Sequence, residues 1–252
     1  MIDSIKKGTA WAIIPARSGS KGIKDKNIRD LNGHPIISYS IAAAKVSSRI
    51  SRVIVSTDSR EYMEIARKYG AEVPFIRPDE ISGDSSTDLE FMEHAINWIF
   101  ENERKLPEFW VHLRCTTPLR DPKIVDEAIE RIMEDNLADS LRSAHKEDVH
   151  PYKWFIDEGA GYYSTLMGNT LDEANNPRQK FPDVYVPDGY VDVLRTSHIV
   201  KNNTLYGNKM IAFHSPKVID LDSLADLEAV EIQCKEYRSP ISEFLDSVRR
   251  CK

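Results

Sequence analysis

Short apolar runs alternate with amphipathic segments along most of this 252-residue chain. The apolar runs have the length of buried strands, and the amphipathic segments repeat apolar residues at three- and four-residue intervals, as one face of a helix does. This alternation is typical of a mainly parallel sheet with helices on both faces. We expect strands at 11–14, 52–56, 73–76, 109–113, 190–194 and 210–213, and helices at 35–45, 59–69, 87–103, 122–134 and 223–235.

The alternation stops between about residues 151 and 187. This part of the chain consists of aromatic, glycine-rich and proline-rich pieces, such as Pro151-Tyr-Lys-Trp-Phe and Gly159-Ala-Gly-Tyr-Tyr. Such pieces do not continue a βα pattern. We interpret the segment as a hairpin excursion from the main sheet, within a single domain that covers residues 1–252.

Composition limits the class of protein. Hydrophobic residues make up 41% of the chain, enough for one large core, and the net charge of -6 argues against a nucleic-acid partner. Three widely spaced cysteines predict neither a disulfide framework nor a zinc site, and are typical of the cytoplasm. The sequence shows no signal peptide and no run of ~20 apolar residues. We therefore expect a cytoplasmic protein without a membrane partner.

The first apolar run ends at Pro15 in a loop that contains glycines and cations. Gly19 and Gly22 would let backbone N–H groups approach a polyphosphate, which Arg17 and Lys21 would neutralise. The spacing matches neither the Walker P-loop nor the dinucleotide-binding fingerprint. A polyphosphate site is one interpretation of this loop, and an ordinary turn with solvated charges is the other.

Asp220 and Asp222 lie two residues apart after a strand-like stretch. In an extended chain both side chains point the same way, and two converging carboxylates suit Mg²⁺ or Mn²⁺. The alternative is that Asp222 or Ser223 caps the helix that follows. The two interpretations are compatible, since one residue can cap while another binds metal.

Two further groups are candidates for ligand contacts. The polar loop from Arg77 to Asp88 contains serines and acids that can cap the next helix and also contact a nucleobase. Lys153 and Arg178 lie beside aromatic residues in the excursion, where solvated surface cations are the usual case.

Five segments, taken in order, resemble the acylneuraminate cytidylyltransferases, also called CMP-sialic acid synthetases, over about residues 10–236. They are Ala16-Arg17-Ser-Gly-Ser-Lys21-Gly22 with Lys26-Asn27, Arg77-Pro-Asp-Glu-Ile, Thr116-Thr-Pro-Leu-Arg120, Arg178-Gln179 ahead of Asp188-Gly189, and Asp220-Leu-Asp222. The resemblance implies a three-layer α/β/α sandwich around a mixed, mainly parallel sheet. It also implies a homodimer in which residues 147–186 pack over the partner subunit.

The resemblance further implies a reaction and a set of roles. CTP would be attacked at its α-phosphorus by the anomeric oxygen of a nine-carbon 2-keto sugar acid, releasing pyrophosphate. Arg17 and Lys21 would be catalytic by holding that pyrophosphate, and Asp220 and Asp222 would bind the metal. The nucleotide-binding residues would be Ala16, Arg17, Ser18, Gly19, Lys21, Lys26, Asn27, Arg77, Ser86 and Asp88, and the sugar-binding residues Arg114, Lys153, Arg178, Gln179, Asp188 and Gly189.

Three positions depart from the family pattern. Arg114 stands where the family usually has Gln, Asp188-Gly-Tyr-Val-Asp192 replaces Asn-Gly-Ala-Ile-Tyr, and Lys24 often corresponds to Pro. The first two fall where the sugar is expected. One alternative is therefore a transferase acting on a sugar 1-phosphate, whose phosphate Arg114 would hold. A non-catalytic sugar-nucleotide binding protein is a second alternative, and a hydride-transferring enzyme is the least expected because the dinucleotide fingerprint is missing.

Overall fold

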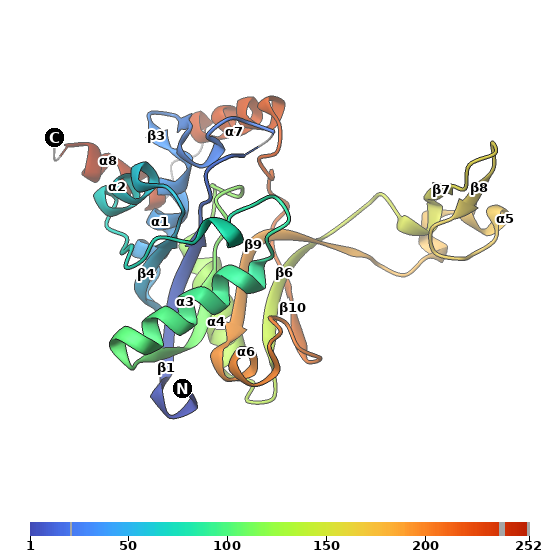
Figure 1. The fold of residues 1–252 in the computed structure, drawn as a ribbon. Coiled ribbons are helices and arrows are strands. Elements are labelled where there is room, and N and C mark those ends of the chain that lie inside the picture. Colours follow the sequence, from blue (N-terminus) through green and yellow to red (C-terminus); the bar gives the residue numbers. More distant parts are fainter. Residues whose placement is uncertain (21, 237–239, 251–252) are drawn as a thin grey trace.

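The computed structural model describes residues 1–20, 22–236 and 240–250. Its centre is a six-stranded sheet with the strand order β10-β6-β9-β5-β1-β4 (Figure 1). Strand β9 is antiparallel to both neighbours, and the other pairs are parallel. The bounds are β1 Ile5–Pro15, β4 Ile50–Ser56, β5 Leu106–His112, β6 Ser140–Lys146, β9 Tyr185–Arg195 and β10 Met210–His214. The mixed, mainly parallel sheet predicted from the sequence is confirmed.

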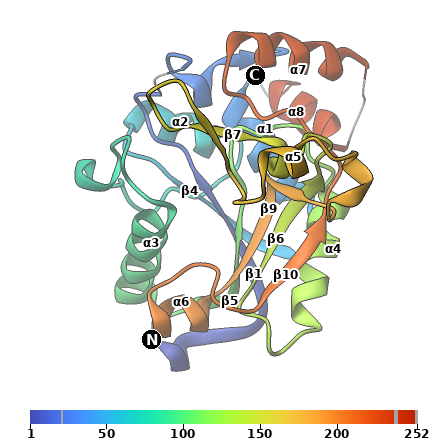
Figure 2. The same cartoon turned by 90° about the vertical axis from the view of Figure 1, so that its right-hand side faces the viewer.

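Helices cover both faces of this sheet (Figure 2). One core cluster joins Ala12 and Ile14 of β1 to α1 Ile36–Val46, α2 Arg60–Lys68, α4 Pro122–Met133, α7 Leu224–Glu236 and α8 Pro240–Arg250. The other joins Ile13 of the same strand to α3 Asp88–Glu103 and α6 Thr196–Asn202. Because successive strand residues point to opposite faces, one apolar run supplies both cores. The three-layer sandwich is confirmed.

The predicted helices begin at the expected residue or one residue after it. Ser59, Thr87 and Asp121 are N-cap residues whose side chains accept hydrogen bonds from the first turns of α2, α3 and α4. Thr87 and Glu90 form a complete capping box. None of the described helices has the length and apolar character needed to cross a membrane.

The strand expected at residues 73–76 is wrong. Only Glu72 makes a bridge, to Ile54, although Val73 and Phe75 are buried. Pro74 has no N–H to donate and therefore interrupts a ladder at this edge of the sheet. Strand β6 and helices α6 and α8 are elements that the sequence reading did not identify.

The predicted hairpin excursion is present. Strands β7 Phe155–Asp157 and β8 Tyr163–Thr165 pair in antiparallel fashion beside the short helix α5 Leu171–Ala174, at the end of a long arm that extends β6 and β9 (Figure 1). A second small hairpin, β2 Asp30–Leu31 with β3 His34–Pro35, precedes α1. The excursion exposes many large apolar side chains: Trp154, Phe155, Ile156, Tyr162, Tyr163, Leu166, Met167 and Leu171.

Candidate active site

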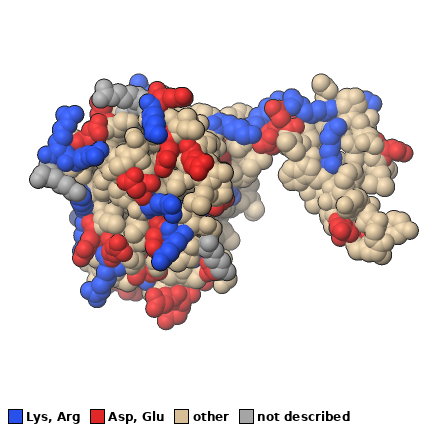
Figure 3. All heavy atoms as spheres, turned by 90° about the horizontal axis from the view of Figure 1, so that it is seen from above, with Lys and Arg blue, Asp and Glu red and all other residues tan. Residues whose placement is uncertain are grey.

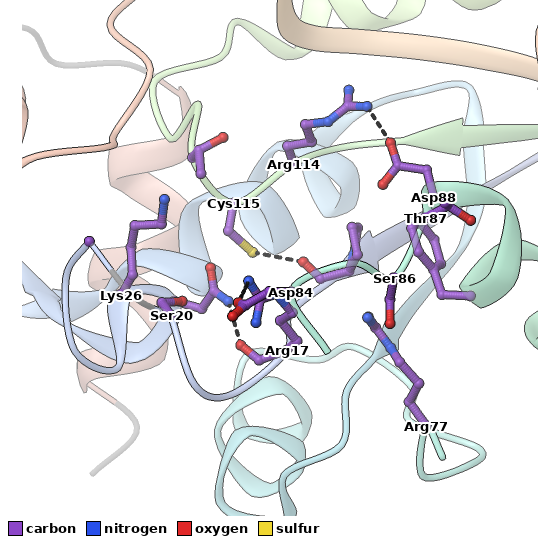
Figure 4. A pocket seen from close by; sticks show the side chains of 15 residues that line it. Arg17, Ser20, Lys26, Arg77, Asp84, Ser86, Thr87, Asp88, Arg114 and Cys115 are labelled. Atoms are coloured by element: carbon purple, nitrogen blue, oxygen red, sulfur yellow. Dashed lines mark hydrogen bonds and ion pairs between the residues drawn. The ribbon is translucent and has the colours of Figure 1, made fainter. Parts of the chain in front are cut away.

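A pocket of about 430 Å³ lies beyond the carboxyl ends of β1 and β5 (Figure 4). Ligands bind in this place in open α/β sheets, because loops from neighbouring strands meet there. The loop after β1, the loop before α3 and the segment after β5 form its walls. Predicted site residues that line it are Arg17, Lys26, Asn27, Arg77, Ser86, Asp88 and Arg114.

The loop after β1 is held by polar contacts on both sides. The backbone N–H and hydroxyl of Ser18 donate to the two carboxylate oxygens of Asp58, at 2.7 and 2.6 Å. Asn27 Nδ2 donates to the Arg17 carbonyl at 3.0 Å. Gly19 has a φ of +73°, which favours glycine. Ala16 is fully buried, and the predicted residue Lys21 lies outside the described residues.

This loop meets the segment around Asp222, about two hundred residues later in the sequence. Lys26 Nζ donates to the Leu221 carbonyl at 2.8 Å and pairs with Asp222 Oδ1 at 3.1 Å. A Cβ on Gly22 would lie only 2.8 Å from the Asp222 carbonyl oxygen, so a larger residue would push the two segments apart. The predicted phosphate loop and one predicted metal ligand are therefore adjacent.

The two predicted metal ligands precede helix α7 and do not cap it. Ser223, not Asp222, caps α7, because its hydroxyl accepts from the Asp226 N–H at 3.2 Å. Asp220 and Asp222 are both exposed. No group of three or more His, Cys, Asp or Glu side chains that could hold a metal occurs among the described residues. Two carboxylates fit Mg²⁺, which usually takes one or two of them and completes its coordination with water and substrate phosphates.

Arg77 is a buried cation at the opposite end of the pocket from Lys26 (Figure 4). Its Nε donates to Ser56 Oγ at 3.1 Å and its Nη2 to the Ser56 carbonyl at 2.5 Å, while the guanidinium lies over the Phe91 ring. Burial lowers the pKa of Arg77 to about 10, so it stays charged at neutral pH. Arg77 forms no ion pair with a carboxylate among the described residues.

Arg114 projects into the same pocket from the end of β5. Its guanidinium pairs with Asp88 at 2.6 Å and with Asp192 at 2.9 Å. Asp88 is the first residue of α3 and faces the pocket, whereas Asp192 is fully buried in β9. Arg114, which stands where the family usually has Gln, is thus paired with an acid on each side.

The other residues predicted to bind sugar lie outside the pocket lining. Asp188 is buried and accepts hydrogen bonds from Ser143, Ser215 and the Tyr190 N–H, and Gly189 lies behind Arg114. The remaining three, Lys153, Arg178 and Gln179, lie on the excursion, which Figure 1 shows far from the body of the same chain. One subunit therefore brings together several of the residues predicted to bind nucleotide, but not the predicted sugar-binding residues of the excursion.

Some pocket residues were missed by the sequence reading. Asp84 pairs with Arg17 at 2.8 Å, and Phe91 and Cys115 line the floor. Burial raises the pKa of the Cys115 thiol to about 12, so the thiol is protonated at neutral pH. The acidic residues of the loop before α3 were visible in the sequence and include Asp84. Their ion-pair partners were not, because each partner lies on a chain segment far away in the sequence.

A family model described as "Cytidylyltransferase" matches residues 11–246. The chain belongs to the cytidylyltransferase family. The chain is 32% identical to N-acylneuraminate cytidylyltransferase of Escherichia coli. The match covers 92% of this chain but only 54% of the length of that relative. The chain is 38% identical to pseudaminic acid cytidylyltransferase of Campylobacter jejuni, covering 88% of this chain and 95% of the relative. These relatives confirm the resemblance found in the motifs.

Solved structures confirm the fold. A CMP:2-keto-3-deoxy-manno-octonic acid synthetase complexed with CTP superposes with a TM-score of 0.65 at 15% identity, over 91% of this chain and 100% of that one. A 4-diphosphocytidyl-2C-methyl-D-erythritol synthase from Anaerococcus prevotii gives a TM-score of 0.60 at 12% identity, over 90% of this chain and 98% of that one.

Proposed function

We propose that this protein transfers the cytidylyl group of CTP to a sialic-acid-like 2-keto sugar acid, producing a CMP-sugar and pyrophosphate. The observation that carries the proposal is the contact of Lys26 with Asp222, which brings a glycine-containing cationic loop and a carboxylate together at one end of the pocket. This combination suits a triphosphate with its metal. The relatives whose names specify sialic, pseudaminic and diacetyllegionaminic acids support the acceptor class.

The residues of this chain have distinct parts in the reaction. Arg17 and Lys21 hold the leaving pyrophosphate, and Lys26 neutralises phosphate charge. Asn27 supports them by fixing the Arg17 carbonyl. Asp220 and Asp222 would hold Mg²⁺ or Mn²⁺, which supplies charge neutralisation and makes the attacking hydroxyl more acidic. Positioning in line, rather than covalent chemistry, then provides most of the acceleration.

The nucleoside lies at the Arg77 end of the pocket. Arg77 has its charge buried against Ser56 and Phe91, which suits a carbonyl oxygen of the base. Ser86 lies beside it on the loop before α3. This arrangement separates the anionic and the neutral parts of CTP.

The acceptor site is completed by a second copy of the chain. The exposed apolar side chains of the excursion indicate a partner surface, because monomeric proteins rarely expose patches of this extent. Arg178 pairs with Asp148 on the arm with both side chains more than half exposed, and such pairs are weak enough to exchange for a ligand carboxylate. Lys153, Arg178 and Gln179 would reach the partner's pocket in a homodimer. The free thiols of Cys115 and Cys234 fit a cytoplasmic enzyme.

The test is a pyrophosphate-release assay. CTP, UTP, GTP and ATP are each combined with nine-carbon keto acids, eight-carbon keto acids and sugar 1-phosphates, with Mg²⁺ or with chelator. We expect release from CTP with a nine-carbon keto acid, dependent on metal and lost in Asp222→Ala. Release with sugar 1-phosphates only, or nucleotide binding without release from any acceptor, contradicts the proposal.

A further inference from the structure

Arg114 lines the pocket, but its guanidinium is paired with two acids. Its Nη2 lies 2.6 Å from Asp88 Oδ2 and its Nη1 2.9 Å from Asp192 Oδ2. Only 24% of its side chain is exposed. One guanidinium that faces two carboxylates carries no surplus positive charge with which to attract an anion.

Asp192, the buried partner of Arg114, lies in strand β9 of the sheet. Asp192 also accepts a hydrogen bond from the Tyr206 hydroxyl at 3.0 Å, and Arg142 Nε lies 3.6 Å from its second oxygen. The Arg142 guanidinium in turn lies over the Tyr206 ring. Asp192 is thus a compensated buried charge, and it fixes one edge of the Arg114 guanidinium.

The stem of Arg114 is fixed as well. Its carbonyl accepts hydrogen bonds from the fully buried Arg120 and from Ser40 Oγ. A Cβ on Gly189 would lie 3.2 Å from Arg114 Cδ, and Gly189 has a φ of +66°. The absence of a side chain at Gly189 therefore leaves the space that Arg114 occupies.

Asp88 is the acid of this group that lines the pocket, next to Arg114. It follows the Thr87 cap at the start of α3, and its side chain is 40% exposed. Arg114 contacts Oδ2 only. Burial by itself would raise the pKa of Asp88, but His112 when protonated and Arg114 at every pH bring it below its usual value.

We propose that Arg114 is a positioning residue for the nucleotide and not a receptor for an anionic acceptor: it holds the Asp88 carboxylate as a hydrogen-bond acceptor for a donor group of the nucleoside. This rests on the proposed function. A carboxylate repels the triphosphate, and Figure 4 shows Asp88 across the pocket from Lys26. The donors of cytidine are the amino group of the base and the ribose hydroxyls.

A double-mutant cycle tests the proposal. We compare Arg114→Gln, Asp88→Asn and the double variant, measuring CTP binding by calorimetry without acceptor and both KM values by pyrophosphate release. Each single variant is expected to weaken CTP binding about tenfold, with the KM of the acceptor changed less than twofold. The double variant should be no weaker than Asp88→Asn alone, because Arg114 acts through Asp88, and Arg114→Lys should recover part of the loss.

The opposite view makes opposite predictions. If Arg114 binds an anionic acceptor, Arg114→Gln raises the KM of the acceptor and leaves CTP binding unchanged. Asp88→Asn then lowers the KM of the acceptor, because Arg114 loses one of its two acidic partners. Either result overturns the proposal. Arg49→Gln, which breaks an exposed ion pair with Glu130 outside the pocket, is the matched control and should leave both constants unchanged.

The donor is identified by comparing CTP, UTP and 2′-deoxy-CTP on Asp88→Asn. A smaller preference for CTP over UTP assigns the amino group, and a smaller preference over 2′-deoxy-CTP assigns the ribose hydroxyl. Unchanged binding of all three by this variant overturns the proposal. If Arg114→Gln fails to fold because Asp192 loses its partner, Asp88→Asn still provides the test, since it uncovers no buried acid. CTP calorimetry needs no acceptor, so failure of every acceptor in the release assay would contradict the proposed function alone.

Discussion

The pocket wall and the excursion use the same residue types in opposite ways. In the wall, Arg114 is fixed between two acids and Asp192 is fully buried. On the arm of the excursion, Arg178 pairs with Asp148 with 52% and 75% of the two side chains exposed. Burial fixes the first pair in one geometry, whereas the second can dissociate at little cost. The comparison separates charges that shape a site from charges that are available to bind.

The apolar residues of the two regions show the same contrast. Trp110 in β5 is fully buried, while Trp154 and Phe155 in the excursion are 45% and 49% exposed. Figure 3 shows the excursion projecting from the body, with much of its tip uncharged. The body supplies its own core, whereas the apolar side chains of the excursion are exposed in the single chain.

The largest expected effect is on the pocket side of the comparison. Arg17→Ala removes a cation that we place on the leaving pyrophosphate, and we expect turnover to fall by at least about a hundredfold. Pyrophosphate release from CTP measures it. Arg29→Ala, which removes an exposed cation next to the phosphate loop but outside the pocket lining, is the control. Near-normal turnover in Arg17→Ala would place the phosphates elsewhere.

The next effect is on the excursion side. Phe155 and Tyr163 stack with their ring centroids 5.7 Å apart on neighbouring strands. Placing Glu at both positions should convert a dimer to monomers, since two charges would enter an apolar contact, and activity should fall with it. Sedimentation velocity measures the mass. Leu137→Glu, at an exposed apolar residue of the body, should leave the mass unchanged. A dimer that survives the double substitution contradicts the assigned interface.

A pH effect on stability is expected from a buried histidine at the end of β5. Burial, with a contribution from Arg114, lowers the pKa of His112 to about 4 from an ordinary 6.5. Between these values the unfolded chain binds a proton that the folded chain does not, so stability is present above pH 6.5 and is lost as the pH falls toward 4. The loss is about 3 kcal/mol from this group. Urea unfolding of His112→Leu and of the native protein at several pH values measures this loss. As the pH falls from 6.5 toward 4, the free energy of unfolding should fall more in the native protein than in the variant. A difference between the two proteins that does not change with pH would contradict the prediction.

The smallest effect compares two identical capping boxes. Thr87 caps α3 beside the pocket, and Thr170 caps α5 in the excursion. Thr87→Ala should lower the free energy of unfolding by about 1 kcal/mol. Thr170→Ala should leave that free energy nearly unchanged and increase proteolytic cleavage near α5, because the excursion contributes little to the core. Equal losses in urea unfolding would show that both regions unfold together.

Local patterns were enough to predict much of the fold. The apolar run around Ile13 predicted a strand, and apolar residues at three- and four-residue spacing after Thr87 predicted a helix, because each signal lies within a few residues. Where the prediction at 73–76 was wrong, burial of Val73 and Phe75 had the period of a strand but Pro74 prevented the pairing.

The site was less predictable, because it depends on contacts between distant segments. The motif resemblance indicated the phosphate loop and Asp222, and the structure places them together. No spacing rule could show that Arg114 pairs with Asp192, 78 residues away. From the sequence, Arg114 was expected to contact a sugar or a phosphate, which assumed that its guanidinium was unpaired. Its pairing with Asp192 depends on β9 lying next to β5, and the sequence does not show which strands are neighbours.

Strand β9 also limits where evolution or design can change the length of this chain. It leads from Tyr185, at the arm, to the Asp192 that holds Arg114, and its pairing with β6 is irregular between Pro187 and Asp192. Its last residues, 192–195, pair regularly with β5, so one residue inserted there would reverse the faces to which the side chains point. The turn at Gly159 and Gly161 has open space around both glycines. Insertions should therefore be tolerated at the tip of the excursion and rejected within the strand that supports it.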